Sequence, residues 1–523
     1  MLGKKIKTMD ERQRRGAILR VMCLSLMMVV AAVASLNVAL PAIARDIGAS
    51  QTQLQWIVDA YAVSFAALLL PAGAIGDRIG RKPVLAFGLA LFGGASLVAM
   101  FAHSPAQLIG LRILMGVGAA FVMPVTLSVI TTVFPPEERG KAVGTWAGVA
   151  AGGGVLGLVT SGVLLEWLDW SSVFGLNVAL AIVALAGTLA VVPSTRAAIP
   201  PRLDPVGTLL SAAGLATFVY GIIEGPERGW TAPVTLTAIL AGVAGIVAFV
   251  GWELRRDEPM LDPRNFLRRG FGAGSGSIAV QFFAVFGFLF LALPYLQLVQ
   301  GFSPIRAAAA LLPMAFLVIP LSRVSPLLAA RFGVRVAGAA GLTSMAAGLA
   351  ILATLDTGSS YWHFLAGLLP FGAGIALAGA PATTAIVASL PSEKQGVASA
   401  VNDVSRELGG ALGIAVLGSL FNAGFRSGMA DATATLPPGT ADQARSSLAA
   451  AEQVGNRLGA GGGDLIAHAQ TAFMDGLSRG LTAGAVVLAL GAVFVALRAP
   501  GRAESTANAG LAPHAGSEQP SPA

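Results

Sequence analysis

The residues of this chain that could do chemistry are a few charged side chains inside long apolar runs. Asp403, Arg406 and Glu407 are spaced i, i+3 and i+4, so a helix would place all three on one face. In a run that begins near residue 397, Asp403 would lie about 9 Å and Glu407 about 15 Å deep in a bilayer. Two acids beside one Arg are not both comfortably ionised at that depth, so we expect one of them to bind a proton. A purely structural charge network is the alternative.

A second charged pair stands in two other apolar runs. Asp59 lies about 8 Å into the run that begins near residue 54, and Arg112 about 10 Å into the run that begins near residue 105. The similar depth permits an ion pair. A buried carboxylate beside an Arg that swings away holds a proton in one conformation and releases it in the other, as proton coupling requires. The alternative is a structural salt bridge that makes both charges tolerable.

A short charged turn separates two apolar runs. The stretch 73–85 reads Gly-Ala-Ile-Gly-Asp-Arg-Ile-Gly-Arg-Lys-Pro-Val-Leu and must lie at a membrane surface, because such a cluster cannot end an apolar run inside lipid. Its cations alone could simply hold the loop in the cytoplasm, but an Asp adds nothing to that signal, which favours a charge lock that biases two conformations. The candidate gating residues are Gly73, Asp77, Arg78, Gly80, Arg81 and Lys82.

The composition is that of a polytopic membrane protein. Of the 523 residues, 55% are hydrophobic and 12% are charged, against about 25% charged residues in soluble domains. The mean hydropathy is +0.74. The net charge of +7 comes from basic residues scattered in short clusters between apolar runs, which does not indicate nucleic-acid binding. A single cysteine, Cys23, excludes a disulfide framework and a Cys-based metal site, and we expect no metal.

Runs long enough to cross a bilayer predict fourteen membrane helices and an all-α polytopic fold. With loops assigned alternately, roughly three quarters of the 34 Lys and Arg residues fall on the side of the N-terminus, so both termini are predicted to be cytoplasmic. The runs lie near 17–43, 54–76, 83–102, 107–131, 141–165, 172–192, 206–224, 232–253, 272–300, 305–329, 334–354, 362–389, 397–422 and 477–498.

An internal repeat divides these helices into two pseudo-symmetric six-helix bundles with two inserted helices between them. Gly80 and Gly157 recur about 255 residues later as Gly333 and Gly413, each in a similar local pattern. Within the long outer connection, an apolar helical face predicts an amphipathic helix on the surface, formed by Leu448, Ala451, Val454 and Leu458. The predicted segments are a basic cytoplasmic arm (1–16), an N-terminal bundle (17–192), inserted helices (193–260), a C-terminal bundle (261–498) with an outer loop (423–476), and a disordered tail (499–523).

Two further groups of residues could serve transport between the bundles. Small residues in the fifth helix let neighbouring helices approach closely and bend, and we take them as a flexible helix: Gly153, Gly154, Gly157 and Gly162. Polar and aromatic side chains elsewhere could line a substrate cavity, although interhelical hydrogen bonding or contact with lipid explains them at least as well: Asn37, Asn177, Gln281, Phe282, Phe286 and Gln297.

The charged turn resembles the loop between helices 2 and 3 of the major facilitator superfamily, and fourteen helices resemble its drug:proton antiporter-2 branch. That resemblance implies proton-driven export of amphipathic drugs or antibiotics, hence multidrug resistance, across a bacterial inner membrane. It also implies a monomer that contacts lipid and uses the proton gradient instead of a cofactor. The first helix departs from the family, because Ala32 and Ala34 replace the usual Asp and Thr before Asn37. Leu158 and Ser161 likewise interrupt the antiporter signature of the fifth helix.

These departures leave other functions open. Without an acid at Ala32, neutral or anionic substrates are favoured over dications, and a dedicated metabolite exporter or an uncoupled facilitator competes with the multidrug antiporter. An ATP-driven pump would need a Gly-x4-Gly-Lys-Ser/Thr loop, which the sequence lacks. No catalytic motif is present either, so we predict that the protein is not an enzyme. A transport-inactive sensor is the remaining possibility.

Overall fold

The computed structural model describes residues 11–196, 203–390, 395–459 and 462–501, and within them it is all-helical, with no strand. Most of the predicted basic arm and nearly all of the predicted tail lie outside the described residues, and the first described helix already begins at Glu11. The all-α prediction is therefore confirmed for the described chain.

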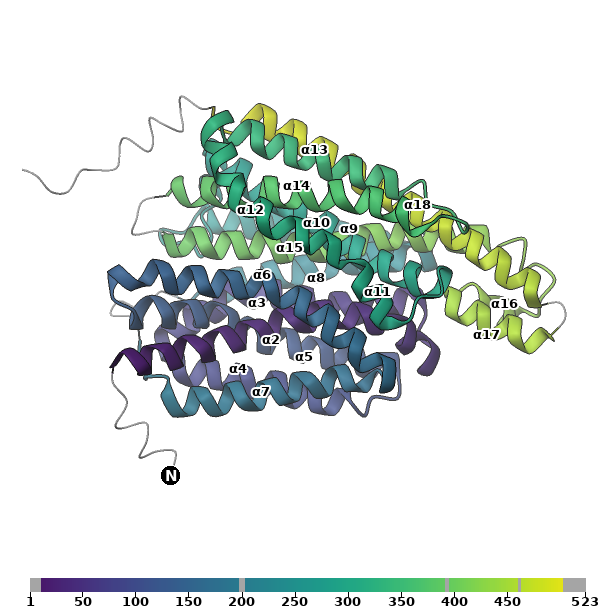
Figure 1. Ribbon diagram of the computed structural model, residues 1–523, viewed down its shortest axis with the longest axis horizontal. Coiled ribbons are helices and arrows are strands. Elements are labelled where there is room, and N and C mark those ends of the chain that lie inside the picture. Colours follow the sequence, from purple (N-terminus) through teal and green to yellow (C-terminus); the bar gives the residue numbers. More distant parts are fainter. Residues whose placement is uncertain (1–10, 197–202, 391–394, 460–461, 502–523) are drawn as a thin grey trace, which may run out of the picture.

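The helices form two bundles that lie side by side, with the inserted pair behind them (Figure 1). The N-terminal bundle contains α2 (Glu11–Asp46), α3 (Gln51–Ile79), α4 (Arg81–Ala99), α5 (Pro105–Val133), α6 (Pro136–Trp167) and α7 (Ser171–Val191). The inserted pair is α8 (Pro205–Arg228) and α9 (Pro233–Glu253). The C-terminal part contains η1 (Pro263–Leu267), α10 (Arg269–Pro294), η2 (Tyr295–Val299), α11 (Pro304–Ala310), α12 (Leu312–Phe332), α13 (Val334–Leu352), α14 (Tyr361–Ala388), α15 (Gln395–Gly428), α16 (Pro438–Ala444), α17 (Leu448–Leu458) and α18 (Gly462–Arg498).

Thirteen helical spans among the described residues are long and apolar enough to cross a membrane. Among the described residues, the remaining long helix, α6, has an apolar segment over Gly152–Trp167. It nevertheless packs along α2 inside the N-terminal bundle. The fourteen-helix prediction and these spans agree, and the chain is a multi-pass membrane protein.

The packing repeats between the two halves. In the N-terminal bundle α2 packs on α6, α4 on α7 and α3 on α5; in the C-terminal bundle α10 packs on α15, α13 on α18 and α12 on α14. The single-residue turns also correspond: Gly80 (φ 131°) joins α3 to α4, and Gly333 (φ 91°) joins α12 to α13. Both turns need a φ that a side chain disfavours, so glycine at the two repeat positions has a backbone reason.

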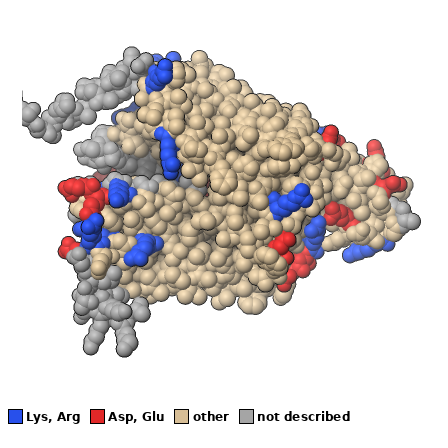
Figure 2. Space-filling model, in the orientation of Figure 1, with Lys and Arg blue, Asp and Glu red and all other residues tan. Residues whose placement is uncertain are grey.

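The molecule has two ends, which are defined by where its helices begin and end. The terminal face is the end at which α2 begins and α18 ends, and the distal face is the opposite end. In Figure 2 the charged side chains gather towards the two ends, and the band between them is largely free of charge. Such a band fits the hydrocarbon core of a bilayer.

The inserted helix α8 contacts both bundles. Its Val219 and Ile223 pack into one apolar cluster with Ala62 of α3 and Ala411 and Ala415 of α15. Ser419 Oγ of α15 also donates a hydrogen bond to the carbonyl of Ile222, at 2.8 Å. The inserted pair therefore covers one side of the seam between the bundles.

A buried carboxylate fixes the start of α8 at the terminal face. Asp204 Oδ1 accepts from the Gly207 N–H at 2.9 Å, and Trp252 Nε1 donates to Asp204 Oδ2 at 2.9 Å. Burial alone would raise the pKa of Asp204, but these hydrogen bonds, with Arg256 nearby, lower it below its ordinary value. The Asp–Pro–x–Gly sequence is thus an N-cap that also ties α8 to α9.

The structure differs from the sequence predictions in three places. The predicted tenth helix is interrupted at Leu311 between α11 and α12. The predicted outer loop is largely helical, because α15 extends to Gly428, α18 already begins at Gly462, and α16 and α17 lie between them. The amphipathic helix is α17, but its apolar face packs on α18 and α2 instead of lying on a membrane surface, and Leu458 is 45% exposed.

Candidate functional site

The charged face predicted on α15 contains one paired and one unpaired acid. Arg406 Nη1 lies 3.9 Å from Asp403 Oδ1, and the Arg406 guanidinium lies 4.6 Å from the centre of the Phe282 ring on α10. Glu407 is 7% exposed, and its Oε2 has no hydrogen-bond partner. A buried carboxylate oxygen in that position is costly unless a proton or a ligand satisfies it.

Asp59 and Arg112 are both fully buried, but they do not form the predicted ion pair. Arg112 Nε instead donates to the Ile57 carbonyl at 2.9 Å, and its guanidinium carbon lies 4.2 Å from the centre of the Tyr61 ring. Neither oxygen of Asp59 has a hydrogen-bond partner in the part of the chain that the structure describes. Two residues at the same depth in the membrane need not face each other, because the direction of a side chain turns by about 100° with each residue of the helix.

The two sets of charges lie on helices that pack against each other, because α3 contacts both α5 and α15. Tyr61 of α3 lies under the Arg112 guanidinium of α5, and its hydroxyl donates to the Val29 carbonyl of α2 at 3.3 Å. Residues predicted separately in the two halves of the sequence are therefore carried by helices that meet at the interface between the bundles.

Hydrogen bonds between the bundles gather in the distal half of the described chain. Gln55 Nε2, at the distal end of α3, donates to the carbonyls of Ile414 and Ala415 on α15, at 3.2 and 3.3 Å. Asn422 Nδ2 donates to Thr52 Oγ1 at 2.9 Å. Further distal links are Gln297 Nε2 to the Val38 carbonyl (2.9 Å), the Gln51 N–H to the Ser446 carbonyl (2.8 Å), and Arg45 Nη2 to Glu452 Oε2 (3.4 Å). We call this set the distal latch.

The charged turn at the terminal face is bonded within the N-terminal half. Arg81 pairs with Asp77 at 2.8 Å and also bonds Thr132 of α5. Lys82 Nζ donates to the Leu189 carbonyl of α7 at 2.8 Å, while Arg78 is exposed. Gly73 lies against Pro124 of α5, where an added Cβ would be 3.5 Å from the proline Cβ. These contacts join the turn after α3, the second membrane helix, to α5 and α7, and the role of the charge lock in gating remains a prediction.

The glycines of α6 make close helix contacts. A Cβ on Gly157 would lie 2.6 Å from the Ala31 carbonyl oxygen of α2, and one on Gly162 would lie 3.0 Å from the Ala308 Cβ of α11. Gly153 and Gly154 also face α2, near Met27 and Val30, with more room. Close approach is confirmed at Gly157 and Gly162, and flexibility remains a prediction.

The cavity candidates fall into different environments. Asn37 Nδ2 bonds the Val33 carbonyl of its own helix, Gln281 Nε2 bonds Ser277 of its own helix, and Gln297 belongs to the distal latch. Asn177 is buried at 2% exposure. Phe282 and Phe286 form an edge-to-face pair, with centroids 5.8 Å apart, next to Arg406. The two phenylalanines are therefore the candidates that the structure places beside the charged face of α15.

Sequence reasoning missed Gln55, Thr52 and Asn422, which form hydrogen bonds between the bundles, and Tyr61, whose ring lies under the Arg112 guanidinium. The signal that could have found Gln55 was its position: it is a polar amide in an apolar helix, four residues before Asp59. Buried amides in membrane helices are commonly interhelical hydrogen-bond donors.

Two repeated helix bundles, joined at one face and carrying unpaired acids where they meet, define a secondary transporter that works by alternating access. The comparisons with known proteins agree. The sequence profile of the Major Facilitator Superfamily matches residues 22–414. This chain belongs to the major facilitator superfamily. The resemblance of its charged turn to that family is confirmed, as is the prediction of a transporter and not an enzyme.

Known relatives match most of the length of this chain. The chain is 36% identical over 412 residues to the puromycin resistance protein pur8 of Streptomyces alboniger, which covers 78% of this chain and 81% of that protein. It is 33% identical over 458 residues to the multidrug efflux pump LfrA of Mycolicibacterium smegmatis, which covers 87% and 90%. It is 34% identical over 433 residues to the methyl viologen resistance protein SmvA of Salmonella typhimurium, which covers 81% and 86%.

Among solved structures, the chain resembles a bacterial homologue of the human lysosomal transporter Spinster in an inward-facing and unoccupied conformation. The TM-score is 0.63, the sequence identity is 18%, and the match covers 95% of this chain and 98% of that one. At this identity the likeness shows the transporter fold alone.

Proposed function

We propose that this chain is a proton-coupled antiporter that exports amphipathic drugs or antibiotics. The observation that carries the proposal is the pair of buried acids with unpaired oxygens, Asp59 on α3 and Glu407 on α15, because these two helices form the interface between the bundles. A buried acid of this kind gains or loses a proton when the interface opens to water. The names of the relatives, which describe resistance and efflux proteins, support export as the direction of transport.

The terminal face is the cytoplasmic face in this proposal. The distal latch then closes the outer side, and the structure represents the conformation that receives substrate from the cytoplasm. Breaking the latch would expose the interface to the outside, where substrate leaves and protons bind to Glu407 or Asp59. Return to the latched state releases the protons inwards. The transporter works as a monomer in the bacterial inner membrane, with both termini cytoplasmic, and the proton gradient supplies the energy.

An uncoupled facilitator is the second candidate, and the environment of Ala32 favours it. Ala32 is 1% exposed and packed inside the N-terminal bundle, so the acid that the family usually carries there has no substitute at that point. Coupling would then rest on Asp59 and the α15 charges alone. If these residues are structural, substrate would only follow its own gradient.

Proteoliposome flux separates the two candidates. Purified chain would be reconstituted with a cationic, a neutral and an anionic amphipathic dye, with and without an imposed proton gradient. The variants are Asp59→Asn, Asp403→Asn and Glu407→Gln, which keep side-chain size and remove one charge each. Glu166→Gln is the matched control, because Glu166 is exposed at the distal end of α6.

The antiporter is supported if the proton gradient drives dye against its own gradient and Asp59→Asn or Glu407→Gln abolishes that flux while Glu166→Gln does not. Flux that follows only the dye gradient, unchanged in all variants, would replace the antiporter with the facilitator. The absence of flux for every dye, with protein that binds dye and remains folded, would refute both.

A further inference from the structure

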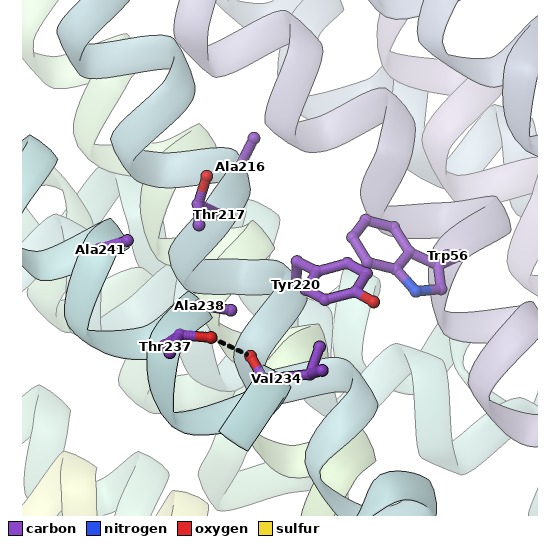
Figure 3. Close-up of a pocket in the computed structure, with 8 residues that line it drawn as sticks. All are labelled: Trp56, Ala216, Thr217, Tyr220, Val234, Thr237, Ala238 and Ala241. Carbon is purple, nitrogen blue, oxygen red and sulfur yellow. Dashed lines mark hydrogen bonds between the residues drawn. The ribbon is translucent and has the colours of Figure 1, made fainter. Parts of the chain in front are cut away.

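A groove of about 600 Å³ opens between α3, α8 and α9 in the distal half of the molecule. Figure 3 shows Trp56 and Tyr220 next to each other on one side of it and the small side chains of Ala216 and Ala241 on the other. The two aromatic rings are 6.0 Å apart, centre to centre. The groove is open on the outside of the molecule, because its lining residues Ala216, Thr237 and Ala241 are exposed, and it therefore faces the lipid and not the seam between the bundles.

The lining of the groove suits an apolar chain. Its described lining contains no charged side chain and three hydroxyl groups, those of Thr217, Tyr220 and Thr237. The Thr237 hydroxyl is already bonded to the carbonyls of Pro233 and Val234 in its own helix, at 2.7 and 3.1 Å, the second of which is drawn in Figure 3. A polar molecule would therefore lose its bonds to water and find few replacements inside. Small side chains beside large aromatic ones instead leave space for methylene groups.

An ion pair stands above the groove at the distal face. Tyr220, Glu224 and Arg228 are spaced i, i+4 and i+8, so they form one stripe of α8 about 12 Å long. Glu224 accepts from Trp56 Nε1 at 3.0 Å and from Arg228 Nε at 2.7 Å. The Arg228 side chain is 51% exposed. The neighbouring Trp230 is 43% exposed, as is usual for tryptophan at the level of lipid headgroups.

We propose that this groove binds one phosphatidylethanolamine molecule from the leaflet at the distal face. One acyl chain lies in the groove beside Trp56 and Tyr220, the phosphate pairs with Arg228, and the headgroup ammonium donates to Glu224. The length of the stripe matches the distance from a headgroup to the upper part of its acyl chain.

The charges at the groove select the headgroup. Glu224 and the exposed Glu227 outnumber Arg228, so an anionic phosphatidylglycerol would be repelled. A phosphatidylcholine headgroup is also zwitterionic, but its ammonium has no N–H to donate to the Glu224 carboxylate. An ethanolamine headgroup satisfies both the Arg and the Glu. This site is separate from the acids assigned to proton coupling, and the proposal does not depend on transport.

Native mass spectrometry of the full chain tests the site. Purified protein would be exposed to equimolar phosphatidylethanolamine, phosphatidylcholine and phosphatidylglycerol, and the retained lipids would be counted. Ala241→Leu fills the groove. Ala244→Leu is the matched control, since it is the same substitution at an exposed position of α9 outside the lining. Arg228→Gln removes the phosphate contact.

We expect wild type to retain one phosphatidylethanolamine in preference to the other lipids. Ala241→Leu and Arg228→Gln should each lower its occupancy about tenfold, the effect of losing one charged hydrogen bond or the buried part of a chain, while Ala244→Leu should not. Equal retention of all three lipids, preference for phosphatidylglycerol, or equal behaviour of Ala241→Leu and Ala244→Leu would overturn the proposal. Should a variant fail to fold, quenching of tryptophan fluorescence by brominated phosphatidylethanolamine replaces it as the test. The quenching should be larger in wild type than in Trp56→Phe, and equal quenching in the two would overturn the proposal.

Discussion

Two glycines five residues apart in α6 should respond in opposite ways to the same substitution. An alanine Cβ at Gly157 would lie 2.6 Å from the Ala31 carbonyl oxygen and 2.8 Å from its Cα, both far inside an ordinary contact. At Gly152 an added Cβ meets no atom of the described residues within 4 Å. Alanine is better than glycine in a helix by about 1 kcal/mol. Whether each substitution raises or lowers the stability of the protein therefore depends on whether packing opposes that gain.

At Gly157 packing should dominate. Overpacking a close contact costs about 1–3 kcal/mol, so after the helix-propensity gain Gly157→Ala should be less stable than wild type by up to about 2 kcal/mol. The strain should extend to Ser161, whose Oγ donates to the Ser35 carbonyl of α2 at 2.8 Å. Gly152→Ala should be more stable than wild type by up to about 1 kcal/mol.

The assay is the thermal denaturation midpoint of each purified variant in detergent, followed by intrinsic fluorescence, with flux in proteoliposomes beside it. A lower midpoint for Gly157→Ala and a higher or equal one for Gly152→Ala, with flux kept in the latter, would establish packing as the role of these glycines. If Gly152→Ala abolished flux while raising the midpoint, α6 would act as a hinge. If Gly157→Ala raised the midpoint, the close contact with α2 would be refuted.

Two further substitutions test the distal latch and the N-cap of α8. Asn422→Leu removes the hydrogen bond to Thr52, which is worth about 1 kcal/mol. It should therefore raise the share of molecules with separated distal ends about fivefold. Pulsed electron paramagnetic resonance between spin labels in the α4–α5 and α13–α14 loops measures this separation, and an unchanged distance distribution would exclude the bond from the distal latch. Because the pKa of Asp204 is lowered in the folded protein, its contribution to stability is present above about pH 4 and is lost as the pH falls through the folded pKa. Asp204→Asn should therefore lower the midpoint at pH 7 and flatten its fall on acidification, and an identical acid profile to wild type would contradict the assigned role.

The sequence predicted the membrane spans, which the bilayer imposes, and the features that a local pattern encodes, which are the glycine turns and the charged face of α15. The length of apolar runs is set by membrane thickness, so the spans were recognisable. The turn at Gly80 and its repeat at Gly333 are local, and each needs a positive φ that glycine supplies. The charged face of α15 followed from spacing on one helix, which fixes which residues share a side.

What the sequence could not predict depends on how helices are rotated against one another. Asp59 and Arg112 were predicted to pair because of their similar depth, yet Arg112 turns to Ile57 and Tyr61. The apolar face of α17 predicted a helix but did not say whether lipid or protein covers it. The lipid-facing groove is formed by Trp56 and helices about 160 residues further on, and no spacing rule connects them.

The position of α8 limits how the two bundles can move. A helix wedged against two bodies that change their relative angle travels with one of them and slides along the other. Towards α3 it is fastened by the hydrogen bond between Trp56 and Glu224. Towards α15 it packs on Ala411 and Ala415, with Leu408, Leu412 and Val416 beside them, and it accepts the hydrogen bond from Ser419. A change in the angle between α3 and α15 would therefore strain one of these two hydrogen bonds, and the side on which the bond survives is the bundle with which α8 moves.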